Sequence, residues 1–499
     1  MRTEKAIYNL IANLVLQIVT AICGFILPAL FIRYYGSEVN GMIGSIKQFI
    51  AYLSLVEGGV GAASVAALYS PLVKQNSKAI NAILSATHIF YKKSGYIFVA
   101  FLILITAFYP WLVRNEIGFS TSLVMVVIIG CGGLIEYFFI GQYRVLLTAD
   151  QKNYVISFIQ ATATALNALA IFFLIIAGTN LLLVQTAATL IYVSRFFVIR
   201  YYVKAHYPHV TFKSEPDFTA IANRWSAFIH QIATIIVFNS PIVIITIFCG
   251  LKAVSIYVVY NMVFAAVGMM VGVFSNGLRA GFGELIAAQE HELLKSAYTN
   301  YEYIYYGALA WAYTCTGLLI MPFIKVYSAN FTDANYIHPD IAILFLIIGV
   351  ANNLRIPPNT VLFAAGHFRE TQRQAILEAA INLTASLIFV QFWGVTGVLL
   401  GSVCSYAYRT LDIILYSAKY IIRQSPLGSI KRIMINFLLA LVAAAPFVFW
   451  LPIETANYRD WLIWAIGMSI YVLVVIMLGN ILTDLAMFKA TWSRVKSII

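Results

Sequence analysis

Residues 7–32 read IYNLIANLVLQIVTAICGFILPALFI and contain no charged side chain. A helix needs about 20 apolar residues to cross the hydrocarbon core of a bilayer, so this run predicts a membrane-spanning helix. It is longer than the apolar part of a cleavable signal peptide, and no small-residue cleavage site follows it. Of the 499 residues, 61% are hydrophobic and only 10% are charged, whereas globular domains average about 25% charged residues. This composition excludes a water-soluble enzyme, a disordered chain and a secreted disulfide scaffold, and it indicates an integral membrane protein.

Further apolar runs of similar length follow along the whole chain. We therefore expect an all-α, polytopic membrane protein with about fourteen transmembrane helices, and a count of twelve stays open. The loops between them are too short to form a separate extramembrane domain, so any function must lie within the helices. The expected spans are 8–32, 41–69, 94–113, 121–143, 154–177, 181–203, 226–249, 254–275, 303–327, 341–365, 374–394, 396–418, 433–452 and 461–482.

The positive charges indicate the orientation of the chain. With the N-terminus inside, most of the 32 lysines and arginines fall in cytoplasmic segments, as the positive-inside rule requires. We predict a multi-pass protein of the cell (cytoplasmic) membrane with both termini in the cytoplasm. The same rule accounts for the net charge of +12, so we expect contacts with membrane lipids and no nucleic-acid partner.

The first twelve spans contain an internal repeat. Pro28 and Pro241, Gly36 and Gly250, and the intramembrane residues Arg195 and Arg409 are each separated by about 214 residues. Six spans per half is an even number, so the halves share one orientation, as in parallel-repeat transporters with a substrate site between the halves. We expect a six-helix lobe at 1–205, a second at 206–425, and two extra transmembrane helices with a cytoplasmic tail at 426–499.

Several charged residues fall inside the expected spans, where each costs roughly 2.5–3.5 kcal/mol at a helix centre. Arg409 has a counter-charge one helical turn away, at Asp412. The others have none at that spacing, so they either pair between helices or line a hydrated cavity: Lys47, Glu57, Arg195 and Arg355.

The charged residues within the spans, together with nearby amides and helix-breaking prolines, give the candidate site. Cations and amides suit an anionic substrate, and acids suit either ion coupling or a charge pair with a cation. The candidate substrate-binding residues are Lys47, Arg195, Arg355, Arg409, Asn239 and Asn352; the candidates for ion coupling or a charge pair are Glu57 and Glu136; the candidate hinges are Pro28, Pro241, Pro357 and Pro358.

Motifs for chemistry are missing from the sequence. No G-x-x-x-x-G-K-[S/T] motif is present, so we expect no ATPase site in the chain. We predict a transporter rather than an enzyme, with no catalytic residue, no metal ligand and no cofactor, and with a proton or a sodium ion as the candidate coupling ion.

Two stretches resemble a known family. Residues 40–61, NGMIGSIKQFIAYLSLVEGGVG, and residues 364–372, AAGHFRETQ, with 378–382 and Tyr408-Arg409 following, are similar to segments of the polysaccharide transporter family. These proteins are oligosaccharide-lipid flippases of the multidrug, oligosaccharidyl-lipid and polysaccharide exporter superfamily.

The resemblance implies two six-helix lobes around a cleft that opens alternately to each side of the membrane. It implies that the cargo is an undecaprenyl-pyrophosphate-linked oligosaccharide repeat unit, which is translocated for the biosynthesis of a surface polysaccharide such as an exopolysaccharide. A polysaccharide polymerase and glycosyltransferases are the implied protein partners.

Three other functions remain open on the sequence. An ion-coupled multidrug exporter of the same superfamily would need a more anionic cleft than four intramembrane cations provide. A peptidoglycan-precursor flippase would handle a chemically similar cargo. A membrane-embedded polymerase or glycosyltransferase would usually carry a sizeable extramembrane loop, which this sequence lacks.

Overall fold

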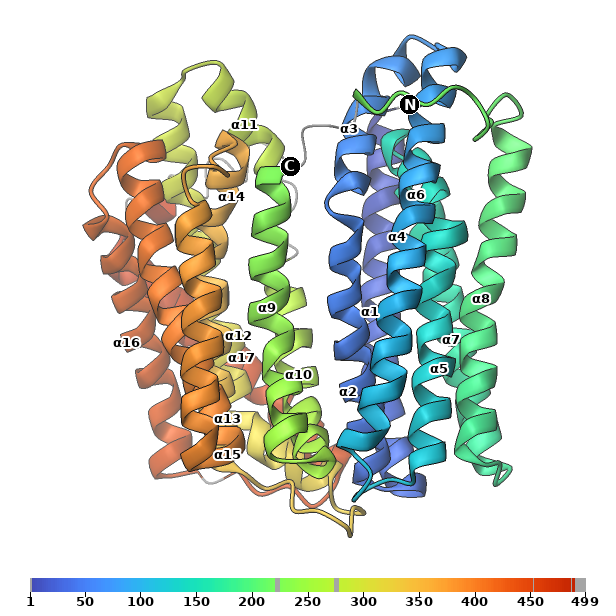
Figure 1. Cartoon of the computed structure of the whole chain (residues 1–499). Coiled ribbons are helices and arrows are strands. Elements are labelled where there is room, and N and C mark those ends of the chain that lie inside the picture. Colours follow the sequence, from blue (N-terminus) through green and yellow to red (C-terminus); the bar gives the residue numbers. More distant parts are fainter. Residues whose placement is uncertain (1, 220–224, 273–277, 452, 486, 490–499) are drawn as a thin grey trace. The chain divides into compact units, whose positions relative to one another are not determined.

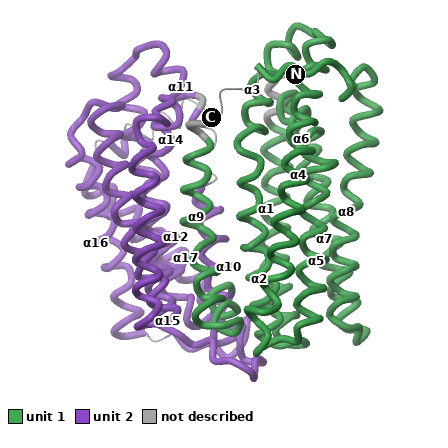
Figure 2. The backbone as a smooth tube through the Cα atoms, in the orientation of Figure 1, with its two compact units in different colours: residues 1–258 green, residues 259–499 purple. Residues whose placement is uncertain are grey.

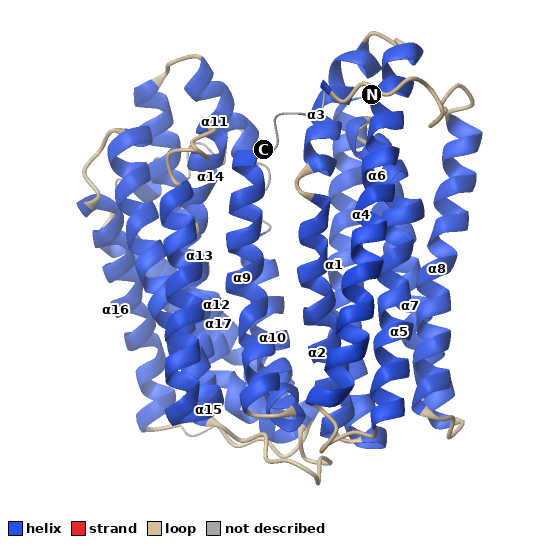
Figure 3. Cartoon of the chain, in the orientation of Figure 1, coloured by secondary structure: helices blue, strands red, loops and turns tan. Residues whose placement is uncertain are grey.

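The computed structural model describes residues 2–219, 225–272, 278–451, 453–485 and 487–489 (Figure 1). Within these residues the protein is helical and contains no strand (Figure 3). Twelve helices in this part are long and apolar enough to cross a membrane, and a bent pair raises the number to thirteen. The all-α polytopic fold expected from the sequence is therefore confirmed.

The longest helical stretch is a hairpin of two helices. α15 (Gln372–Tyr416) changes direction at Gly394, where φ is 55° and ψ is −128°. Asn382 on the first arm donates to the hydroxyls of Ser402 (3.3 Å) and Ser405 (3.0 Å) on the second. Each arm is long enough to span a bilayer, so counting the arms separately gives the fourteen apolar segments expected from the sequence.

The chain divides into two compact units, residues 1–258 and 259–499 (Figure 2). This boundary lies within α10, and the predicted lobes at 1–205 and 206–425 stay a prediction. The first unit contains α1 (Arg2–Tyr35), α2 (Ser37–Leu53), η1 (Ser54–Glu57), α3 (Val60–Val73), α4 (Ser77–Leu112), α5 (Phe119–Ile135), η2 (Glu136–Ile140), α6 (Gly141–Ala149), α7 (Asn153–Ile176), α8 (Leu181–His206), α9 (Trp225–Phe248) and the start of α10 (Leu251–Gly272).

The second unit is built around the long helix α12. Its other helices pack on α12 or on each other, and Leu319 of α12 forms an apolar cluster with Ala443 of α16 and Met468 of α17. The unit contains the rest of α10, α11 (Leu278–Ala287), α12 (His291–Tyr327), α13 (Pro339–Leu354), α14 (Ile356–Ala365), α15, η5 (Ser417–Ile422), α16 (Leu427–Phe449) and α17 (Tyr458–Thr483).

Two of the four candidate hinge prolines lie inside continuous helices, and the other two lie in the first turn of a helix. Pro28 lies inside the continuous helix α1, and Pro241 lies inside the continuous helix α9. Pro357 and Pro358 instead lie in the first turn of α14, directly after α13 ends. Proline is favoured in a first helical turn because the missing N–H has no partner there anyway.

The α9–α10 turn packs closely on α2 within the first unit. Ser45 bonds Thr246 (2.8 Å), and Asn40 bonds Ser255 (2.8 Å). A Cβ atom on Gly41 would lie only 1.9 Å from the carbonyl oxygen of Leu251. Only glycine allows the backbones to approach this closely.

Gly41→Ala is therefore expected to destabilise the protein by about 1–3 kcal/mol, because the backbone of α10 must move away from α2. The control is Gly24→Ala, since no atom lies within 4 Å of its added Cβ and alanine favours a helix over glycine. Thermal unfolding of the purified proteins in detergent measures both effects. A Gly41→Ala protein as stable as Gly24→Ala would contradict the close contact.

Asp150, between α6 and α7, ties several chain segments together. Its carboxylate accepts from Lys5 of α1 (3.1 Å), Lys152 (3.1 Å) and the Tyr207 hydroxyl after α8 (2.5 Å). Burial tends to raise the pKa of Asp150, but the bonds from Tyr207, Lys152 and Lys5 outweigh it and lower the pKa below its ordinary value of 3.8. The ionised form is thus favoured by folding.

Asp150→Asn is expected to lower the free energy of unfolding at pH 7 by about 1–2 kcal/mol, because hydrogen bonds to a charged group are lost at a partly exposed site. A carboxyl group whose pKa is lowered by folding stabilises at pH values above its unfolded pKa and loses that effect as the pH falls through the folded pKa. The gap between wild type and variant should hold from pH 7 to about pH 4 and close below it. A gap that does not change down to pH 3 would contradict this account.

Candidate functional site

The candidate residue Arg355 lies at a break between two helices. α13 ends at Leu354 and α14 begins at Ile356. Because Pro357 and Pro358 have no N–H, they cannot donate the usual i to i−4 bonds, and the carbonyls of Asn353 and Leu354 are left without these partners. The sequence Arg-Ile-Pro-Pro thus places a cation beside two carbonyls that lack their usual α-helical donors; the Asn353 carbonyl accepts from the Arg355 N–H instead.

Arg355 and Arg409 form a buried charge cluster with two carboxylates, which we call the arginine cluster. Arg355 donates to Glu378 (2.5 Å) and to the side chain of Asn352 (2.7 Å). Arg409 lies 3.7 Å from the other Glu378 oxygen and 2.6 Å from Asp412. Arg355 is only 9% exposed. Each of these buried charges thus faces an opposite charge, and removing one partner alone would leave a buried charge uncompensated.

Three sequence candidates therefore come together: Arg355, Arg409 and Asn352. The pairing of Arg409 with Asp412 follows the spacing noted in the sequence, and Arg355 pairs with a neighbouring helix. Glu378, which bridges the two arginines, was not among the sequence candidates. Its signal was present, since it is one of few acids and lies near the start of the expected span 374–394.

The acidic candidates Glu57 and Glu136 lie in the first unit, at two helix irregularities. Glu57 ends the 3₁₀ turn η1 and is followed by Gly58 and Gly59, both with positive φ; the helices on either side bend by 45°. Glu136 begins the π-helix η2, and π-turns of this kind frequently occur at functional sites.

Tyr91 and Arg144 complete this second charged group. The Tyr91 hydroxyl donates to Glu57 (2.5 Å), and Arg144 pairs with Glu136 (2.8 Å). An open pocket of about 470 Å³ is lined by Glu57, Tyr91 and Arg144 together with small residues of α3. A Cβ on Gly141 would lie 2.3 Å from the Tyr91 ring, so glycine makes room for the tyrosine. Neither Tyr91 nor Arg144 was among the sequence candidates.

The remaining candidates are separate from the arginine cluster. Arg195 of α8 donates to the Gln160 side chain and to the carbonyl of Tyr192 (3.0 Å). Lys47 is exposed on α2, and Asn239 is half-buried on α9. Among the described residues, no carboxylate lies within ion-pair distance of Arg195 or Lys47.

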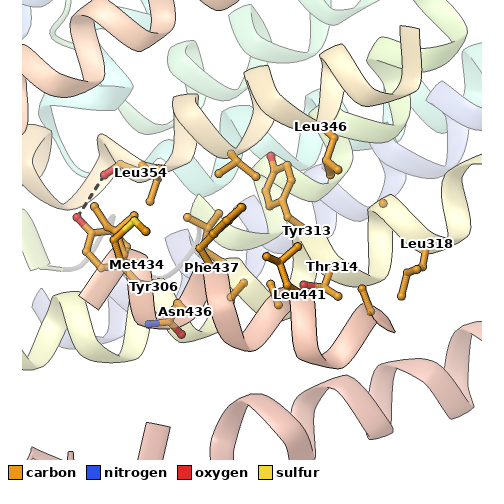
Figure 4. A pocket seen from close by; sticks show the side chains of 17 residues that line it. Tyr306, Tyr313, Thr314, Leu318, Leu346, Leu354, Met434, Asn436, Phe437 and Leu441 are labelled. Atoms are coloured by element: carbon orange, nitrogen blue, oxygen red, sulfur yellow. Dashed lines mark hydrogen bonds between the residues drawn. The ribbon is translucent and has the colours of Figure 1, made fainter. Parts of the chain in front are cut away.

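An apolar groove of about 550 Å³ lies between α12, α13 and α16 (Figure 4). Small residues of α12 and α16, such as Gly317 and Ala440, leave the space that larger side chains would fill. Leu354 and Tyr306 lie at one end of the groove and Leu318 at the other (Figure 4). Leu354, which lines the groove, directly precedes Arg355 in the chain, whereas none of the four charged residues of the arginine cluster lines the groove.

Comparison with solved structures shows a shared fold at low sequence identity. An inward-facing "multidrug resistance MATE family transporter of the MOP superfamily" has a TM-score of 0.64 at 13% identity, over 87% of this chain and 98% of that chain. The "lipid II flippase MurJ", in an inward closed conformation, has a TM-score of 0.64 at 14% identity, over 94% and 99%. A MATE protein "in the bent conformation" has a TM-score of 0.58 at 12% identity, over 88% and 97%.

A scan against models of protein families and a search of curated proteins find no match. The chain thus has the fold of the MOP-superfamily transporters and is a multi-pass membrane protein.

Proposed function

We propose that this protein is a flippase for an undecaprenyl-pyrophosphate-linked oligosaccharide repeat unit. It moves the unit across the cytoplasmic membrane by alternating access between the two predicted six-helix lobes, and it serves surface polysaccharide biosynthesis. Both termini are in the cytoplasm, and a polymerase and glycosyltransferases act on the same lipid-linked intermediates.

The observation that carries this proposal is that Leu354 of the apolar groove and Arg355 of the buried arginine pair are consecutive residues at the α13–α14 break. Such a cargo has an apolar polyprenyl chain joined to a diphosphate. Each CH₂ of the chain favours an apolar environment by about 0.8 kcal/mol. Guanidinium groups bind phosphate oxygens by charge-assisted, often bidentate hydrogen bonds. The diphosphate replaces the Glu378 carboxylate at Arg355 while the chain lies in the groove.

The sugar headgroup explains why a protein is needed. Each hydroxyl group costs several kcal/mol to remove from water without a new hydrogen bond, so a repeat unit does not cross the bilayer core unaided. Lys47, Arg195, Asn239 and Asn352 supply polar groups to the same cargo under this proposal. Glu57, which lines an open pocket, and Glu136 supply the coupling site for a proton or a sodium ion, and the four prolines act as hinges.

Two alternatives are supported by the structural neighbours. The MurJ likeness supports a peptidoglycan-precursor flippase, since that cargo is also lipid-linked. The MATE likeness supports an ion-coupled multidrug exporter. The apolar groove beside two arginines favours a lipid-linked anion over a cationic drug.

Filling the groove tests the proposal. Ala440→Trp is expected to weaken binding of the undecaprenyl-diphosphate-linked oligosaccharide to protein in nanodiscs at least tenfold, because the indole takes the space of the chain; tenfold corresponds to about 1.4 kcal/mol. Leu438→Trp is the control, because Leu438 lies on the same helix but is exposed and does not line the groove. Equal binding by both variants would contradict the assignment of the chain to this groove.

A further inference from the structure

Tyr306 of α12 touches both the groove and the broken helix. Its ring lines the groove although the residue is only 1% exposed. Its hydroxyl lies 3.4 Å from the Leu354 carbonyl, as drawn in Figure 4. That carbonyl is one of the two that the prolines leave without their usual α-helical partners, since residue 358 has no N–H to donate.

The same hydroxyl also lies 3.4 Å from Glu302. Glu302 is fully buried and is held by Arg432 (2.7 Å) and Ser429 (3.0 Å) of α16. Glu302 therefore has donors other than Tyr306.

A phenol has a single proton to donate, and both distances exceed the usual O–H···O length of about 2.7–2.8 Å. The hydroxyl therefore lies between two acceptors and bonds neither of them closely. A small movement of the ring decides which acceptor receives the proton.

We propose that Tyr306 couples the apolar groove to the α13–α14 break. An apolar chain in the groove packs on the Tyr306 ring and turns its hydroxyl fully onto the Leu354 carbonyl, which orders the break and fixes Arg355 for the headgroup. Tyr306 is thus a positioning residue: it links tail binding to headgroup binding. Coupling of this kind is reciprocal, so headgroup binding strengthens tail binding by the same factor. The inference rests on the proposed function, since it assigns the groove to the lipid chain.

Hydrogen–deuterium exchange of the peptide covering residues 353–360 tests this coupling, with undecaprenyl phosphate as the probe. In the wild type we expect the lipid to slow exchange of this segment at least threefold, and inorganic pyrophosphate alone to slow it less, because the groove stays empty. In Tyr306→Phe the lipid should bind with a Kd within threefold of wild type, but the slowing should be lost. Tyr303→Phe, which removes a phenol hydroxyl from the same helix outside the groove lining, should retain it.

The outcomes separate the two proposals. Lipid binding with normal slowing in Tyr306→Phe, or no slowing in the wild type, would overturn the coupling and leave the flippase proposal standing. A more than tenfold loss of binding in Tyr306→Phe would also overturn it, because Tyr306 would then be a direct binding residue. No lipid binding by the wild type would overturn the flippase proposal and this inference with it.

Discussion

Neutralising the Arg355–Glu378 pair with Arg355→Gln and Glu378→Gln is expected to stop polysaccharide export while the protein still folds and inserts. The double variant keeps side chains of similar size and removes both charges of the pair, so no buried charge is left without a partner. What it loses is the guanidinium that the proposed function assigns to the diphosphate. A hydrogen bond to a charged group contributes about 1.5–3 kcal/mol, so we expect output to fall at least tenfold.

The measurement is surface polysaccharide in cells that lack the gene and carry each variant, with the amount of protein in the membrane measured alongside. Arg355→Gln alone should lose both output and protein, because Glu378 then keeps only Arg409, at 3.7 Å. Arg369→Gln is the control, since Arg369 is exposed in the same unit. Full polysaccharide output from the double variant would contradict a role of the arginine cluster in transport of the cargo.

Arg432→Ala is expected to destabilise the protein by about 3–5 kcal/mol. It leaves the Glu302 carboxylate, which is 0% exposed, without its ion-pair partner at 2.7 Å, and breaking a buried pair on one side costs about this much. Ser429 still donates to the carboxylate (3.0 Å), but a hydroxyl does not compensate a full charge. The pair joins α12 to α16, so the groove between these helices should be lost as well.

The thermal unfolding midpoint in detergent reports this effect. Adding Glu302→Gln to Arg432→Ala should restore a large part of the stability, because the buried charge is then gone. Lys431→Ala removes a neighbouring exposed cation and should change stability little. If Glu302→Gln does not restore stability, the destabilisation by Arg432→Ala does not come from an unpaired buried carboxylate.

The sequence predicted the helices well because hydrophobic runs decide the spans. The expected boundary between spans 374–394 and 396–418 coincides with the turn at Gly394, and glycine allows that backbone conformation without a steric cost. Gly36 and Gly250, which the predicted repeat pairs, both have positive φ and each precedes a helix.

The sequence predicted the site only in part, because local spacing cannot reveal partners on other helices. Arg409 and Asp412 are three residues apart and could be paired directly. Glu378 is 23 residues from Arg355 along the chain, so only the folded α15 brings them together. Arg195 and Arg409 occupy equivalent positions in the predicted repeat, yet Arg195 bonds Gln160 where Arg409 has carboxylates.

The groove could be predicted from the sequence even less than the charged site. Its space comes from small residues such as Gly317 and Ala440 on helices far apart in the sequence. In an apolar chain, glycine and alanine have many ordinary uses in helix packing. Nothing in the sequence alone distinguishes those that leave a groove open.

Transfer of the cargo itself is the most direct measurement of the central claim. The purified protein would be reconstituted in liposomes that carry a fluorescent undecaprenyl-diphosphate-linked oligosaccharide in both leaflets, and the label accessible to a membrane-impermeant quencher would be followed in time. The account predicts that the quenched fraction rises from about half toward the whole when the protein is present, and that the Arg355→Gln/Glu378→Gln variant behaves like empty liposomes. A wild-type protein that leaves the inner-leaflet lipid in place, with or without a proton or sodium gradient, would contradict the account.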